Sequence, residues 1–184
     1  MISGLHRVAE SDCEHIGRGL LAQPANTLSS LAYVLSGMML LWSALAGRPI
    51  ARLAPVVYAV TVIDVGIRSA AFHGPMPAWG RFAHDLSIAA VLAFVIGYDV
   101  AFARRSTVSA GLAVFGGLAG ACAVVLALWP DTGNALGRTD APLCEPEAPV
   151  QLHAVWHVLT AFVLFLYGTA VLGPREQARP KIRA

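Results

Sequence analysis

Two histidines in the last apolar segment of the chain, His153 and His157, stand four positions apart. Residues at i and i+4 lie on one face of a helix, so both imidazoles can point at the same ion. His73, at the end of an earlier apolar segment, can supply a third imidazole. Three neutral imidazoles and a water molecule form a common catalytic zinc shell with one open position. The spacing therefore predicts a zinc site.

Two further polar residues suit hydrolysis at such a metal. Ser69 stands one helical turn before His73, where its hydroxyl could stabilise a developing oxyanion. Asp85 directly follows His84 and could accept a proton from the attacking water. Each residue also has a simpler interpretation, as a hydrogen-bonded packing group or, for Asp85, as an acid at a helix N-terminus. Because ionisable groups are costly in membrane helices, their convergence favours the functional interpretation.

The segments that carry these residues are long and apolar. Apolar residues make up 57% of the 184 residues and charged residues 13%, against about 25% charged in an ordinary globular domain. Five segments approach the ~20 residues that a helix needs to cross a bilayer. They are 28–46, 53–72, 84–103, 108–129 and 151–173. Lipid offers no partner to an open strand edge, so we expect an all-α, polytopic membrane helix bundle with about five transmembrane helices.

The chain divides into three expected parts. The first helix should begin with Asn26 or Thr27 as its N-cap, which leaves 1–26 as an N-terminal arm, 27–173 as the bundle and 174–184 as a basic tail. The arm lacks the apolar core of a signal peptide, so the first helix must direct insertion. The net charge of +2, without a basic run interleaved with aromatics, argues against a nucleic-acid partner.

Lysine and arginine outside the spans predict the orientation of the bundle. Eight of these residues fall on the side of the C-terminus and four on the other side. The eight are Arg48, Arg52, Arg104, Arg105, Arg175, Arg179, Lys181 and Arg183, and the four are Arg7, Arg18, Arg81 and Arg138. We expect the N-terminus outside and the C-terminus inside, in a bacterial inner membrane because Ala and Arg are frequent and Lys is rare. His73, Asp85 and His153 then reach the same outer leaflet.

Other patterns concern packing within the bundle. Asp64 and Arg68 are four apart and predict an ion pair along one helix. Gly116 and Gly120 have GxxxG spacing, which suits close helix packing or simply reflects a segment rich in Gly and Ala. Cys122, in the same segment, suits a small packing residue.

The two remaining cysteines fall in segments that we expect on the outer side. Disulfides persist in such compartments, so Cys13 and Cys144 would either join the arm to the connector 130–150 or remain as two free thiols.

Four stretches, in order, resemble the motifs of one family. Residues 13–14 (Cys-Glu) with 26–29 (Asn-Thr-Leu-Ser) are similar to its N-terminal signature, and 66–73 resemble its Gly-x-x-Ser-x-x-Phe-His stretch. Asp85 stands where the family has an Asp, and 153–157 resemble its His-x-x-Trp-His stretch. The motifs resemble those of the alkaline ceramidase branch of the CREST membrane hydrolase superfamily, which also contains adiponectin-receptor-like and Per1-like proteins.

This resemblance implies a chemistry and assigns roles. It implies that His73, His153 and His157 bind zinc, with Asp85 and Ser69 in the catalytic site. The reaction would be hydrolysis of the amide bond of an N-acyl lipid drawn from the bilayer, near the extracytoplasmic face. The family's link between its N-terminal cysteine and a later loop also supports a Cys13–Cys144 disulfide.

The chain departs from the family in two respects. We expect five helices where the family typically has seven. The family also binds calcium through its N-terminal motif, whereas here Ile16 replaces an Asn and Gln23 stands near the place of a Glu. Calcium takes six to eight oxygen ligands, so we do not expect it here. Two other functions stay open: a receptor or scaffold with a structural zinc ion, and a lipid esterase of the same superfamily.

Overall fold

The computed structural model describes residues 12–46, 53–103, 108–128 and 145–172, with the side chains of 102–112 left out. The regular structure in these ranges consists of α-helices. They are α1 (Pro24–Ser29), α2 (Leu31–Ala46), α3 (Leu53–His73), α4 (Gly80–Ala103), α5 (Val108–Leu128) and α6 (Leu152–Val171). The predicted all-α fold is confirmed for the described part of the chain.

Four helical stretches are long and apolar enough to cross a membrane. They are Pro24–Ala46, Leu53–His73, Gly80–Ala101 and Leu152–Val171. In α5 the apolar helix with described side chains is shorter, Ala113–Leu128. Large apolar side chains also point outward, as Trp42 on α2 does with 78% of its surface exposed. Such faces suit lipid better than water, and the bundle has the character of a polytopic membrane protein.

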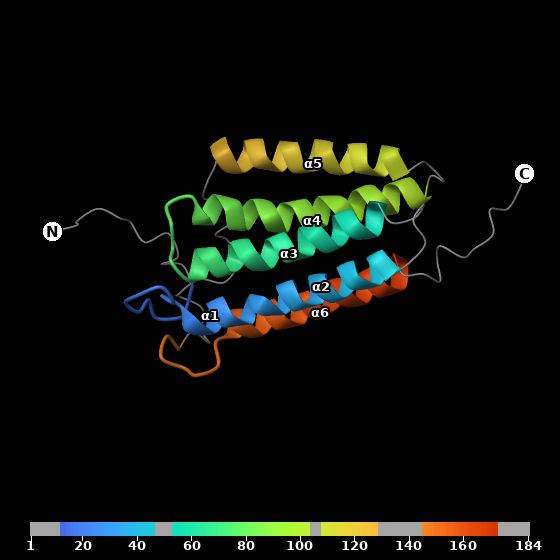
Figure 1. Ribbon diagram of the computed structural model, residues 1–184. Helices are drawn as coiled ribbons and strands as arrows, with labels where there is room; N and C mark the ends of the chain where they lie inside the picture. The colour runs from blue at the N-terminus through green and yellow to red at the C-terminus, as the bar shows by residue number, and fades with distance from the viewer. Residues whose placement is uncertain (1–11, 47–52, 104–107, 129–144, 173–184) are drawn as a thin grey trace, which may run out of the picture.

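The helices run side by side, and from α2 to α5 each helix packs against the next one in the chain. α5 lies at one edge of the bundle, followed by α4 and α3, and α2 and α6 pack against each other beyond α3 (Figure 1). The end of α3 and the beginnings of α4 and α6 meet at the same end of the bundle, beside α1 (Figure 1). This arrangement brings the histidine-bearing ends of three helices together.

Two helix starts differ from the sequence prediction. α1 begins at Pro24, with Gln23 as its N-cap, instead of after Asn26 or Thr27. α4 begins at Gly80, four residues before the predicted start, so Asp85 lies in its second turn and does not open it. Both helices therefore begin a few residues earlier than the apolar pattern indicates.

Close contact between α2 and α3 depends on glycine. A Cβ atom at Gly66 would lie 2.9 Å from the carbonyl oxygen of Ser30, and one at Gly37 would lie 2.9 Å from that of Ala59. These positions therefore let the two backbones touch. By contrast, a Cβ at Gly116 or a Cβ at Gly120 of α5 would meet nothing within 4 Å in the described structure. The GxxxG spacing there does not mark a close contact between described helices.

Candidate metal centre

The three predicted imidazoles lie together at one end of the bundle. His73 is the last residue of α3, and His153 and His157 face it from the first turns of α6. The ring centroid of His73 is 5.0 Å from that of His153 and 5.2 Å from that of His157, and the latter two are 4.5 Å apart. Residues separated by some 80 positions thus form one cluster.

Two nitrogen atoms of this cluster lack a hydrogen-bond partner. Nε2 of His73 and Nε2 of His153 are both buried, and neither bonds a described residue. Leaving a buried polar atom unsatisfied costs about 1–3 kcal/mol. A cation would satisfy both lone pairs at once, so the residues fit a metal ion.

The structure adds two donors that the sequence did not assign to the zinc site. Ligand atoms of His73, His84 and His157 lie within 4.8 Å of one another, and so do those of Asp12, His73 and His153. Both sets could hold a metal ion. His73 belongs to both, whereas His157 belongs to the first and His153 to the second. For His84, the one signal in the sequence is its place directly before Asp85.

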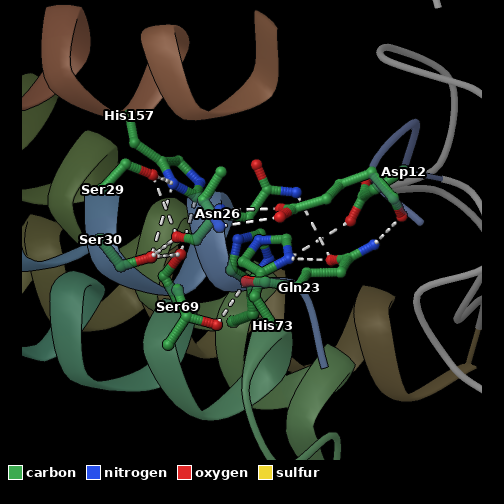
Figure 2. Close-up of polar contacts among 12 residues, drawn as sticks. Asp12, Gln23, Asn26, Ser29, Ser30, Ser69, His73 and His157 are labelled. Atoms are coloured by element: carbon green, nitrogen blue, oxygen red, sulfur yellow. Dashed lines mark hydrogen bonds and ion pairs between the residues drawn. The ribbon is translucent and has the colours of Figure 1, made fainter. Parts of the chain in front are cut away.

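Asp12 reaches the cluster from the N-terminal arm. Its Oδ2 lies 3.5 Å from Nδ1 of His73 (Figure 2). Burial raises the pKa of Asp12 to about 6, although the nearby His84 acts in the opposite direction. The carboxylate of Asp12 therefore lies among the residues that form the candidate metal centre. The residues around Asp12 in the sequence do not indicate this position.

Asp85 approaches the cluster through His84. Its Oδ1 lies 2.9 Å from Nδ1 of His84, and the His84 ring is 5.7 Å from the ring of His73. A carboxylate accepts hydrogen bonds, so Nδ1 of His84 donates to Asp85 and the other ring nitrogen keeps its lone pair. Asp85 thus orients a histidine at the edge of the candidate metal centre.

Ser69 belongs to a group of hydroxyls around His157. Its Oγ shares a hydrogen bond of 2.9 Å with the Oγ of Ser30 and lies 3.4 Å from Nε2 of His157. On the other side of the ring, the Oγ of Ser29 lies 2.9 Å from Nδ1 of His157 (Figure 2). Ser69 is buried, and its hydroxyl is held inside the site by Ser30, the C-cap of α1, and by His157 of α6.

Glu14 fixes the arm to the start of α1. Its Oε1 accepts the backbone N–H of Ala25 at 2.7 Å, and its Oε2 accepts that of Asn26 at 2.9 Å. The first N–H groups of a helix have no partner within the helix, so this carboxylate caps α1 from a distance. The cap explains why α1 begins earlier than a local N-cap would indicate.

No family model, no curated protein and no solved structure matches this chain.

The cysteines are described only in part. Cys122 on α5 has a free thiol and is half-buried. Cys144 lies outside the described residues, so the structure gives only the Cys13 end of the predicted disulfide, which stays a prediction.

Proposed function

We propose that this chain is a zinc-dependent membrane hydrolase that cleaves the amide bond of an N-acyl lipid. The observation that carries the proposal is the meeting of three imidazoles at the end of a lipid-facing bundle, two of them with buried Nε2 atoms that lack a partner. Ionisable groups buried within membrane helices usually serve a function, because burying them is costly.

The donor set favours zinc over the hard cations. Neutral imidazole nitrogens suit zinc and other transition metals, whereas calcium and magnesium prefer oxygen ligands. His73, His153 and His157 would hold the ion. In the described structure His73 and His157 group with His84, and His73 and His153 group with Asp12, so both Asp12 and His84 lie beside them. When bound, zinc supplies a Lewis acid that polarises a carbonyl group and activates water.

The chain's own residues would manage the proton and the developing charge. Asp85 holds the Nδ1 proton of His84, so the pair can take a proton at Nε2 of His84 and pass it to the leaving nitrogen. In this proposal His84 takes the proton and Asp85 positions it, whereas the sequence alone predicts Asp85 itself as the base beside the metal. The hydroxyl of Ser69, fixed by Ser30, is positioned to stabilise the oxyanion.

The substrate class follows from where the centre lies and from the family resemblance. The helices beside the centre expose apolar side chains, including Trp156 on α6 with 61% of its surface exposed. A lipid could approach along such a face from the bilayer. The likeness to the ceramidase branch supports an amide bond, and the charge pattern supports a site near the extracytoplasmic face of a bacterial inner membrane.

One observation favours a structural zinc ion instead. Asp12 and His84 could close the position that a catalytic zinc keeps open, because structural zinc sites have four protein ligands. In that case the protein would be a receptor or scaffold. An esterase would use the same zinc chemistry on an ester bond.

Metal analysis combined with a panel of N-acyl and O-acyl lipids tests the proposal. We expect about one zinc ion per purified chain, release of a fatty acid from an N-acyl lipid, and loss of both in His157→Ala. Chelation should stop hydrolysis while thermal unfolding in detergent still shows a cooperative transition. A protein without zinc contradicts the proposal, and one that binds zinc but unfolds on chelation and hydrolyses no lipid supports the scaffold. Release from O-acyl lipids alone would support the esterase.

A further inference from the structure

The short helix α1 touches two of the three histidines. Gln23, its N-cap, contacts His73, and Ser29, its last residue, contacts His157 (Figure 2). Both contacts involve Nδ1 of the imidazole. A neutral imidazole carries its proton on one nitrogen only, so a partner at Nδ1 decides whether Nε2 has a lone pair for a metal.

Gln23 determines the proton position of His73. Its Oε1 lies 2.7 Å from Nδ1 of His73, and its Nε2 donates to the carbonyl of Glu14 at 3.0 Å. The carbonyl of Glu14 can only accept a hydrogen bond, so the amide nitrogen of Gln23 faces it and the amide oxygen faces His73. Nδ1 of His73 must therefore be the donor in the contact with that oxygen. The backbone N–H of Gln23 also donates to the carbonyl of His73 at 3.0 Å. Gln23 is fully buried, so water does not compete for these bonds.

Ser29 has the same effect on His157. Its Oγ donates to the carbonyl of Asn26 at 3.0 Å and lies 2.9 Å from Nδ1 of His157. A hydroxyl has one proton, which the bond to Asn26 uses, so the oxygen accepts from Nδ1–H of His157. Nε2 of His157 then has a lone pair, and the Oγ of Ser69 lies 3.4 Å from it.

We propose that α1 sets the tautomers of the metal centre, with Gln23 and Ser29 as positioning residues that keep the protons of His73 and His157 on Nδ1. Both Nε2 lone pairs are then presented to the cation. The opposite tautomer would aim an N–H group at the ion and prevent ligation. Nε2 of His73 has no hydrogen-bond partner among the described residues, as expected if its lone pair faces a cation. The inference rests on the proposed metal centre but concerns residues that neither the spacing nor the motifs assign to it.

The tautomers can be measured without metal. Zinc-free protein labelled with 15N-histidine reports the protonated ring nitrogen through its 15N chemical shifts, and the loss of signals in His73→Asn and His157→Asn assigns the two rings. We expect the Nδ1–H form at both in the wild type. Gln23→Leu should mix the tautomers of His73 only, and Ser29→Ala those of His157 only.

Zinc affinity gives an independent measurement. In competition with a zinc chelator, Gln23→Leu and Ser29→Ala should bind zinc about 10–100-fold more weakly, as is usual when a metal-binding histidine loses its hydrogen-bond partner. Gln23→Glu and Ser29→Thr keep an acceptor oxygen and should retain the Nδ1–H tautomer, and Ser29→Thr should also keep the wild-type affinity. A purely structural role for these residues would change stability but not the tautomers.

Two matched controls separate this effect from a general loss of stability. Gln151→Leu removes another buried amide, whose Nε2 donates to the carbonyl of Ala148 at 2.8 Å. Thr61→Val removes a hydroxyl that donates to the carbonyl of Tyr58 at 2.7 Å within α3. Neither should alter the tautomers of His73 and His157.

The possible results distinguish the two proposals. If the wild type binds zinc, but Gln23→Leu and Ser29→Ala keep both tautomers and the full affinity, the role of α1 is overturned. If the wild type binds no zinc, the proposed function fails, while the tautomers of the zinc-free variants still decide what α1 does.

Discussion

Asp85 and His84 show how a neighbouring residue changes the role of a carboxylate. Taken alone, Asp85 would accept a proton directly from water. In the structure its Oδ1 is 2.9 Å from Nδ1 of His84, and His84 is one of the potential ligands. The carboxylate therefore holds a proton on a histidine of the candidate centre, much as carboxylates orient histidines in hydrolytic sites.

Asp85→Asn tests this pair. An amide cannot carry the charge that stabilises a protonated His84, but it leaves His73, His153 and His157 in place. We expect the variant to keep its zinc and to lose about 10²–10⁴-fold in turnover, the usual contribution of a positioned acid or base. Zinc content and fatty-acid release, measured on the same preparation, check both parts. Full activity in the variant would rule out a role for the pair in proton transfer.

At the scale of residues, the sequence predicts which histidines meet better than it predicts the residues that contact them. His73, His153 and His157 could be grouped because helix ends that share a leaflet must lie at the same depth. Asp12 and Gln23 could not be grouped with them. Their positions depend on how the arm folds back over the helix ends, and nothing in their local spacing encodes that path.

At the scale of elements, the apolar pattern predicts where the helices are but not how they start or touch. The pattern has no information about Glu14, a distant residue that caps α1 and so moves its start to Pro24. The ion pair of Asp64 and Arg68 is confirmed, with Nε of Arg68 at 2.7 Å from the carboxylate, because such a pair depends on helix geometry alone. The close contact at Gly66 depends instead on how two helices meet.

Gly66→Ala tests that contact. The added methyl group would meet the carbonyl oxygen of Ser30 at 2.9 Å and the side chain of Val34 at 2.6 Å. We expect a destabilisation of about 1–3 kcal/mol, typical of overpacking, together with weaker hydrolysis because Ser30 and Ser69 would be forced apart. Gly116→Ala is the matched control: the methyl group meets nothing within 4 Å in the described chain, and alanine favours helix by up to about 1 kcal/mol. Thermal unfolding in detergent measures both, and equal effects would contradict the packing argument.

At the scale of the whole molecule, the centre joins parts of the chain that are far apart in sequence. The arm, α3, α4 and α6 all contribute, and the arm carries Asp12, Glu14 and Gln23 over the helix ends. The backbone N–H of His15 also donates to the carbonyl of Pro146 at 3.1 Å, which ties the arm to the segment before α6. The predicted Cys13–Cys144 disulfide would connect the same two regions, so it should matter for the metal centre.

Thiol counting tests the disulfide and its consequence together. The chain has three cysteines, and Cys122 is free, so alkylation of the denatured protein should modify one thiol before reduction and three after it. Reduction should also weaken zinc binding, because the arm that positions His73 through Gln23 would be held less firmly. Cys122→Ala is the control and should leave zinc affinity unchanged with and without reductant. Alkylation of all three thiols without reduction would remove the disulfide, and unchanged affinity on reduction would show that the contacts of the arm hold the centre without it.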